Sequence, residues 1–90
     1  MAIRFFGEVE RLYVDSAGCY IRLQNATSSP ANDPFPKDGY FQIRSDHANY
    51  DSLYSLAMLA SSGRHRLQIR TSTAATAAER ARVSYLVLDW

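Results

Sequence analysis

The side chains in this chain that are best suited to chemistry are two histidines and one cysteine. Neither His47 nor His65 belongs to a pair with the spacing of a metal motif such as His-Glu-x-x-His. His47 and Asp51 are four residues apart and would face each other on a helix, but the dipole at a helix start favours an acidic residue there without any partner. The histidines therefore predict neither a metal site nor a catalytic pair.

Cys19 alternates in phase with Ile21 and Leu23, which is the pattern of a buried structural thiol. A nucleophilic cysteine needs an exposed, electropositive setting and a nearby base. A single cysteine also excludes an intrachain disulfide. With only four glycines, the chain has no glycine-rich phosphate loop and no G-x-S-x-G turn. The sequence thus predicts a protein that is not an enzyme and needs no cofactor.

Two short alternating segments instead predict a binding surface. If Cys19 and Ile21 point into a core, the alternate residues of that strand point outward, because successive side chains of a strand face opposite sides. In the same way, if Phe41 and Ile43 point inward, the residues that alternate with them point outward. Such side chains supply stacking faces and hydrogen-bond donors for bases or sugars, although they are also ordinary on a solvated sheet. The candidate ligand-binding residues are Tyr20, Arg22, Gln24, Tyr40, Gln42 and Arg44.

Charge argues against nucleic acid as the ligand. The formal net charge is +1, and contacts to a phosphate backbone normally dominate such affinity. A weak basic stretch does occur near the C-terminus, where five arginines stand against one glutamate, Glu79: Arg64, Arg66, Arg70, Arg80 and Arg82. Arginine suits carboxylate and phosphate recognition, but nine of the ten basic residues are arginine, so general composition accounts for the stretch as well.

Strand patterns frame one helical segment. β-branched and aromatic residues predict a first strand, turn residues follow, and a bulge or bend is expected near Gly7. The three prolines predict a loop that is neither strand nor helix. The expected strands are 3–14, 19–24, 40–44, 64–71 and 83–90, with a loop at 25–39 and an Ala- and Thr-rich connection at 72–81.

A helix is predicted at residues 48–61. Asp46 or Asn49 can cap its start, and Gly63 stands where a left-handed C-cap is expected. Its apolar residues spread over more than one face, which predicts a second contact such as another subunit. The candidate assembly residues are Tyr50, Leu53, Tyr54, Leu56, Met58 and Leu59.

This order of elements predicts one domain over residues 1–90: a mainly β (α+β), five-stranded Greek-key barrel with its helix between strands three and four. It resembles the OB-fold. The segment YDSLYSLAMLASSGRHRLQIRT, residues 50–71, is also similar to the helix, glycine and strand unit of the receptor-binding B subunits of bacterial pentameric toxins. That resemblance implies a secreted protein that forms ring-shaped pentamers, with the helices lining the centre, and binds cell-surface glycans.

The N-terminus has charged residues and no apolar core of a signal peptide, and no segment is apolar enough to span a membrane. A cytoplasmic location is the default expectation, or a secreted one if a signal peptide has been removed. Composition is that of a folded chain, with 47% hydrophobic and 21% charged residues. The sequence predicts a noncatalytic, self-assembling binding module for a glycan or a partner protein. The alternative is a single-stranded nucleic-acid-binding protein.

Overall fold

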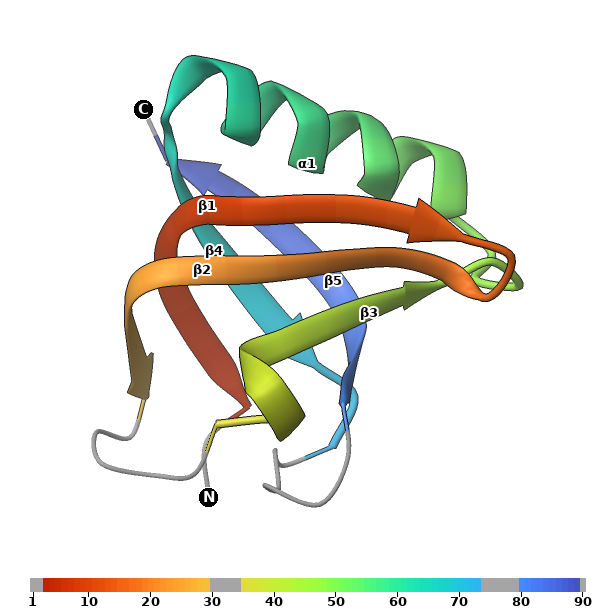
Figure 1. Cartoon of the computed structure of the whole chain (residues 1–90), viewed down its shortest axis with the longest axis horizontal. Helices are drawn as coiled ribbons and strands as arrows, with labels where there is room; N and C mark the ends of the chain where they lie inside the picture. Colours follow the sequence, from red (N-terminus) through yellow and green to blue (C-terminus); the bar gives the residue numbers. More distant parts are fainter. Residues whose placement is uncertain (1–2, 30–34, 74–79, 90) are drawn as a thin grey trace.

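The computed structural model describes residues 3–29, 35–73 and 80–89. Within these residues five strands close into a ring, and one helix lies across it (Figure 1). The strands are β1 (Arg4–Asp15), β2 (Gly18–Ser29), β3 (Tyr40–Arg44), β4 (Arg66–Thr71) and β5 (Ala81–Asp89). A short 3-10 turn, η1 (Lys37–Gly39), precedes β3, and the helix α1 (Tyr50–Gly63) lies between β3 and β4. The predicted mainly β class with one helix between the third and fourth strands is confirmed.

The strands of the ring differ in length. Their order around the circumference is β1, β2, β3, β5, β4. β1 and β2 form a long antiparallel hairpin that curves along its length (Figure 1). The ring closes between β3 and β5, which run parallel and pair, within the described residues, at Phe41 with Ala81 and Gln42 with Arg82. The remaining pairs, β2 with β3, β1 with β4 and β4 with β5, are antiparallel.

Two bulges let β1 and β2 curve. Glu10 has no partner on β2, because Val9 pairs with Leu23 and Arg11 pairs with Arg22. On β2, Asn25 and Ala26 both stand opposite Gly7, and Asn25 adopts a left-handed conformation with φ 51°. An extra residue bends a strand and shifts its alternation, so both ends of each strand can face the same core. The predicted bend near Gly7 is confirmed.

The core fills the inside of the ring with alternate side chains of every strand. The fully buried large side chains are Phe5, Phe41, Ile21, Ile43, Leu67, Ile69, Thr71 and Cys19. Phe35, just before η1, packs edge-on against Phe5 with ring centroids 5.2 Å apart. The helix contributes Leu53, Ala57 and Ala60, which are spaced to lie along one face. The small alanines let α1 pack closely against β1 and β5.

Several predicted boundaries were wrong. β2 continues to Ser29 instead of ending at residue 24, because the curled first half of β1 supplies partners up to Arg4 opposite Ser29. The predicted loop therefore loses residues 25–29 to β2 and 37–39 to η1. Residues 30–34 and most of the 72–81 connection lie outside the described residues.

The helix begins and ends two residues later than predicted. Asn49 stands at the N-cap, but its side chain makes no capping bond; its backbone N–H donates instead to Nδ1 of His47 at 3.0 Å. At the other end the left-handed residue is Arg64, with φ 56°, and Gly63 is still helical. A Cβ at position 63 would crowd the His65 ring, so this glycine makes room for a side chain.

Candidate functional site

The outer face of β1, β2 and β3 carries two rows of cross-strand neighbours. Tyr13 pairs with Tyr20, which pairs with Gln42; in the next row Arg11 pairs with Arg22, which pairs with Tyr40. Residues in register on one face stand within side-chain reach of each other. These six residues and Arg80, which precedes β5, are called the tyrosine–arginine cluster below.

The tyrosine rings of the cluster contact each other. The Tyr13 and Tyr20 rings are stacked with centroids 4.6 Å apart, and the Tyr13 and Tyr40 rings meet edge-to-face at 5.4 Å. Such pairs contribute about 0.5–1.5 kcal/mol beyond the burial of their area. The outer face of the sheet thus has a small aromatic layer of its own, separated from the core by the strands.

Guanidinium groups cover these rings. Arg80 lies 4.8 Å from the Tyr20 centroid and 5.4 Å from the Tyr40 centroid, and Arg22 lies 5.9 Å from the Tyr40 centroid. Tyr20 and Tyr40, although they point outward, are only 5% and 8% exposed. The outward direction that the alternation predicts is found, but the rings do not offer open stacking faces.

Hydrogen bonds and one ion pair fix the positions of the polar groups. Arg11 Nη1 donates to the Tyr40 hydroxyl, and Gln42 Nε2 donates to the Tyr20 hydroxyl, both at 3.3 Å. Arg22 Nε lies 3.1 Å from Oε1 of the bulged Glu10, with both side chains about half exposed. An exposed pair of this kind adds little stability, roughly 0–1 kcal/mol, but it orients the guanidinium.

The other two predicted ligand-binding residues lie beside the cluster on the same strands, but they contact other groups. Arg44 is held by its neighbour Asp46, with Nε 3.1 Å from Oδ1. Gln24 lines a hollow of about 210 Å³ at the bends of β1 and β2 together with Phe6, Gly7, Glu8, Asn25, Thr27 and Arg66. The structure therefore brings four of the six predicted residues, Tyr20, Arg22, Tyr40 and Gln42, into the cluster. It places Arg44 two residues from Gln42 on β3 and Gln24 two residues from Arg22 on β2.

Three members of the cluster were missed from the sequence: Arg11, Tyr13 and Arg80. Two of them could have been found, because a turn at Ser16 and Ala17 sets the hairpin register and places Tyr13 opposite Tyr20. Arg80 could not, because only the closure of the ring between β3 and β5 brings it there. The arginine-rich stretch also divides: Arg66 lies over Phe6 and Arg70 over Tyr85.

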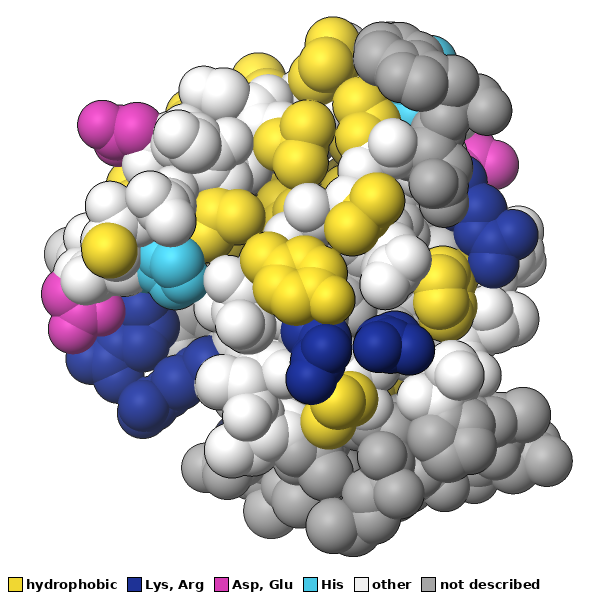
Figure 2. All heavy atoms as spheres, turned by 180° about the vertical axis from the view of Figure 1, so that it is seen from behind, with side chains coloured by type: hydrophobic (Ala, Val, Ile, Leu, Met, Phe, Trp, Pro, Cys, Tyr) yellow, Lys and Arg dark blue, Asp and Glu magenta, His cyan; other side chains and the backbone are white. Residues whose placement is uncertain are grey.

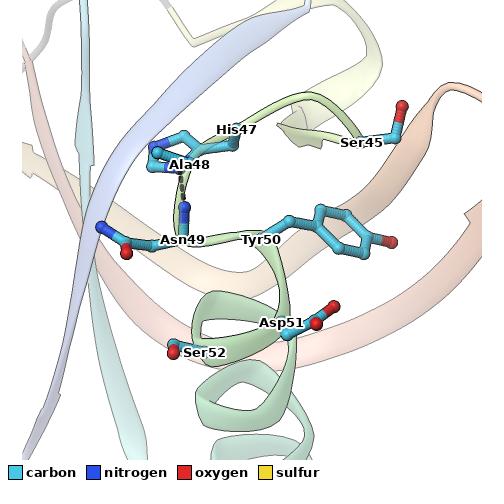
Figure 3. A pocket seen from close by; sticks show the side chains of 7 residues that line it. All are labelled: Ser45, His47, Ala48, Asn49, Tyr50, Asp51 and Ser52. Atoms are coloured by element: carbon cyan, nitrogen blue, oxygen red, sulfur yellow. Dashed lines mark hydrogen bonds between the residues drawn. The ribbon is translucent and has the colours of Figure 1, made fainter.

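The start of α1 forms an open hollow of about 430 Å³, shown in Figure 3. His47 does not face Asp51 across a helical turn, since the helix begins only at Tyr50. Its Nδ1 accepts the Asn49 N–H, so Nε2 carries the proton and donates to the Ser84 carbonyl at 3.2 Å. Ser84 is the bulged residue of β5, between the pairs of Val83 and Tyr85. His47 thus joins the helix start to β5.

The thiol of Cys19 is fully buried, and burial raises its pKa to about 11. At neutral pH the group is therefore the uncharged thiol, which is a poor nucleophile. Within the described residues no group of three or more His, Cys, Asp or Glu side chains is placed to hold a metal ion.

The predicted assembly residues divide between two sides of α1. Leu53 is buried in the core, and Tyr50, Tyr54 and Leu56 are partly buried against it. Met58 and Leu59 are exposed, at 44% and 46%. No helix formed by the described residues is long and apolar enough to cross a membrane.

Comparisons of the chain with protein-family models, with curated protein sequences and with solved structures found no significant match.

Proposed function

We propose that this protein is a noncatalytic binding module of the OB-fold kind, and that its tyrosine–arginine cluster recognises an acidic surface of a partner protein. The OB-fold assignment is supported by the ring order, by the parallel closure of β3 and β5, and by a bent β1 that pairs with both β2 and β4. In that fold the outer face of the central strands carries ligands.

One observation carries the choice of ligand: guanidinium groups cover the outward-facing rings of Tyr20 and Tyr40, which are almost fully buried. Arg11, Arg22 and Arg80 lie on or beside the tyrosines, and Arg82 extends the row through its pairing with Gln42. Of these four arginines, Arg22 forms an ion pair with Glu10. Among the described residues this face is therefore locally positive, although the chain as a whole is near neutral.

The types of residue favour a protein partner. Arginine and tyrosine are enriched among the residues that dominate the binding energy of protein interfaces. A guanidinium held over a ring loses less freedom on binding a carboxylate than a free one does, because it is already oriented. Glycans and bases usually stack on open aromatic faces, and here Tyr20 and Tyr40 are covered. Nucleic acid is the second candidate, which the local positive charge favours.

The experiment compares three probes on the same protein: a fluorescent peptide rich in Asp and Glu, a single-stranded oligonucleotide, and an array of neutral glycans. We expect the acidic peptide to bind, with an affinity that falls as salt rises. Replacing Arg11 and Arg22 together with Gln should weaken this binding about tenfold, equivalent to ~1.4 kcal/mol. A variant with Gln at Arg64 and Arg66 removes the same charge outside the cluster and should bind almost normally.

The proposal is wrong if the two double variants bind the peptide equally, because net charge alone would then explain the affinity. Binding of the oligonucleotide in preference to the peptide, with the same dependence on Arg11 and Arg22, would assign the cluster to the second candidate. Binding of neutral glycans alone would show that the arginines do not determine the ligand.

We further propose that the protein assembles with copies of itself through the outer side of α1. The exposed residues of α1 are Asp51, Ser52, Ser55, Met58, Leu59, Ser62 and Gly63, which include a single charge. Small and apolar side chains allow two helices to approach closely, and a solvated helix face is normally richer in charge. Light scattering should show an oligomer that Leu59→Arg dissociates and Ser62→Arg weakens less. A monomer for the unchanged protein would exclude this assembly.

A further inference from the structure

A second group of basic and aromatic side chains lies on the outer face of β1, β4 and β5, away from the tyrosine–arginine cluster. Arg4 of β1 pairs with Arg70 of β4, which pairs with Tyr85 of β5. All three alternate with core residues, since Phe5, Ile69 and Leu86 are buried. The three side chains therefore stand next to each other on the outside of the ring. Figure 2 shows basic side chains beside hydrophobic ones in the middle of this view.

Arg70 and Tyr85 contact each other directly. Arg70 Nη1 donates to the Tyr85 hydroxyl at 3.4 Å, and its guanidinium carbon lies 5.7 Å from the ring centroid. The hydrogen bond from Arg70 is the main cause that lowers the pKa of Tyr85 below its ordinary value near 10, and the charge of Arg4 acts in the same direction. The hydroxyl of Tyr85 thus lies in a positive field formed by two guanidiniums.

Neither arginine has an acidic partner among the described residues. This differs from the cross-strand arginines of the tyrosine–arginine cluster, where Glu10 pairs with Arg22. The adjacent row on the same face, Phe6, Gln68 and Val87, is uncharged. Like charges directly opposite each other in a sheet destabilise it. An anion between Arg4 and Arg70 would relieve that repulsion.

We propose that Arg4, Arg70 and Tyr85 form a binding site for the phosphate or sulfate group of a small organic ester. The two guanidiniums supply hydrogen-bond donors in the planar arrangement that suits such oxyanions, and the Tyr85 hydroxyl donates a further bond. The ester part lies over the neighbouring apolar surface, where the Tyr85 ring and Val87 are 40% and 37% exposed. This site is independent of the tyrosine–arginine cluster, since the two share no residue.

The test measures the binding of phenyl phosphate, inorganic phosphate and inorganic sulfate by amide chemical-shift changes, with sodium chloride at equal ionic strength as the reference. We expect shifts in β4 and β5 around Arg70 and Tyr85, and tighter binding of phenyl phosphate than of the inorganic anions. Arg4→Gln and Arg70→Gln should each weaken phenyl phosphate at least tenfold. Arg66→Gln, on the same strand, should change it little.

Thermal unfolding of each variant checks that the fold is kept, and Tyr85→Phe gives a second readout, because it removes the hydroxyl and leaves the ring. That variant should bind phenyl phosphate more weakly than the unchanged protein does. Equal shifts with chloride, or binding that survives both Arg4→Gln and Arg70→Gln, would overturn the proposal. Stronger binding of the inorganic anions than of phenyl phosphate would overturn the part that assigns an organic ester.

Discussion

The Arg80 guanidinium lies over the Tyr20 ring, 4.8 Å from its centroid. Tyr20 is on the second strand of the ring and Arg80 immediately precedes the last, so the contact exists only when the ring has closed. It covers an outward-facing ring that the strand alternation alone would leave in solvent. The chemistry of the outer face therefore depends on the closure of the ring.

Replacing Arg80 with Gln should expose the Tyr20 and Tyr40 rings and cost about 0.5–1 kcal/mol, because a cation–π contact with each ring is lost. Iodide should then quench tyrosine fluorescence more strongly. Arg82→Gln is the control, since that side chain is exposed and lies two residues further along the chain. If both variants lose the same stability and show the same quenching, the Arg80 contact is not what covers the rings.

Two glycines with positive φ should respond differently to alanine. At Gly18, with φ 145°, a Cβ would overlap the Ile43 carbonyl oxygen, so Gly18→Ala should destabilise by roughly 2–4 kcal/mol or prevent folding. At Gly39, with φ 76°, the nearest atom to a Cβ is Arg22 Nε at 3.7 Å, so only backbone strain of about 1 kcal/mol is expected. Urea unfolding of both variants measures the difference. Equal losses would show that β2 and β3 separate readily at Gly18.

The sequence was sufficient for features that depend on local patterns. The alternation in Tyr40–Arg44 predicted β3 with its observed boundaries, and Gly7 marked the bend in β1. The outward direction of Tyr20 and Tyr40 followed from the same alternation. In each case the residues concerned are close together in the sequence, so no knowledge of the closed ring was needed.

Features that depend on distant partners were not predicted. Residues 25–29 have low strand propensity and form the end of β2 only because β1 curls back to pair with them. The Arg80 contact requires the parallel pairing of β3 and β5, which joins segments that are far apart in the chain. That contact helps to cover Tyr20 and Tyr40, and so the sequence suggested a stacking surface where the structure has arginines.

Arg64→Gly should stabilise the protein by about 0.5–1 kcal/mol. Arg64 holds the left-handed position after α1, with φ 56° and ψ 35°, where glycine avoids the steric cost of a Cβ. Its side chain is exposed, so little packing is lost. Thermal unfolding should show a higher midpoint for this variant. Arg66→Gly, in the following strand, is the control and should lower the midpoint, because glycine weakens a strand. If Arg64→Gly lowered the midpoint as well, the Arg64 side chain would itself stabilise the helix end.

Cys19 should make the stability fall at alkaline pH. Its pKa is about 11 in the folded protein, against 9.0 for an unperturbed thiol, so the unfolded chain releases the proton first as pH rises. The stability from this group is complete below pH 9 and is lost between pH 9 and 11, by an amount on the order of 2 kcal/mol.

Unfolding in urea across this range, for the protein and for Cys19→Ala, isolates the thiol from the other groups that titrate there. Below pH 9 the free energies of unfolding of the two proteins should differ by a constant amount. Above pH 9 this difference should become smaller. Parallel curves throughout, or rapid reaction of the native protein with a thiol reagent at neutral pH, would mean that the Cys19 side chain is accessible to water.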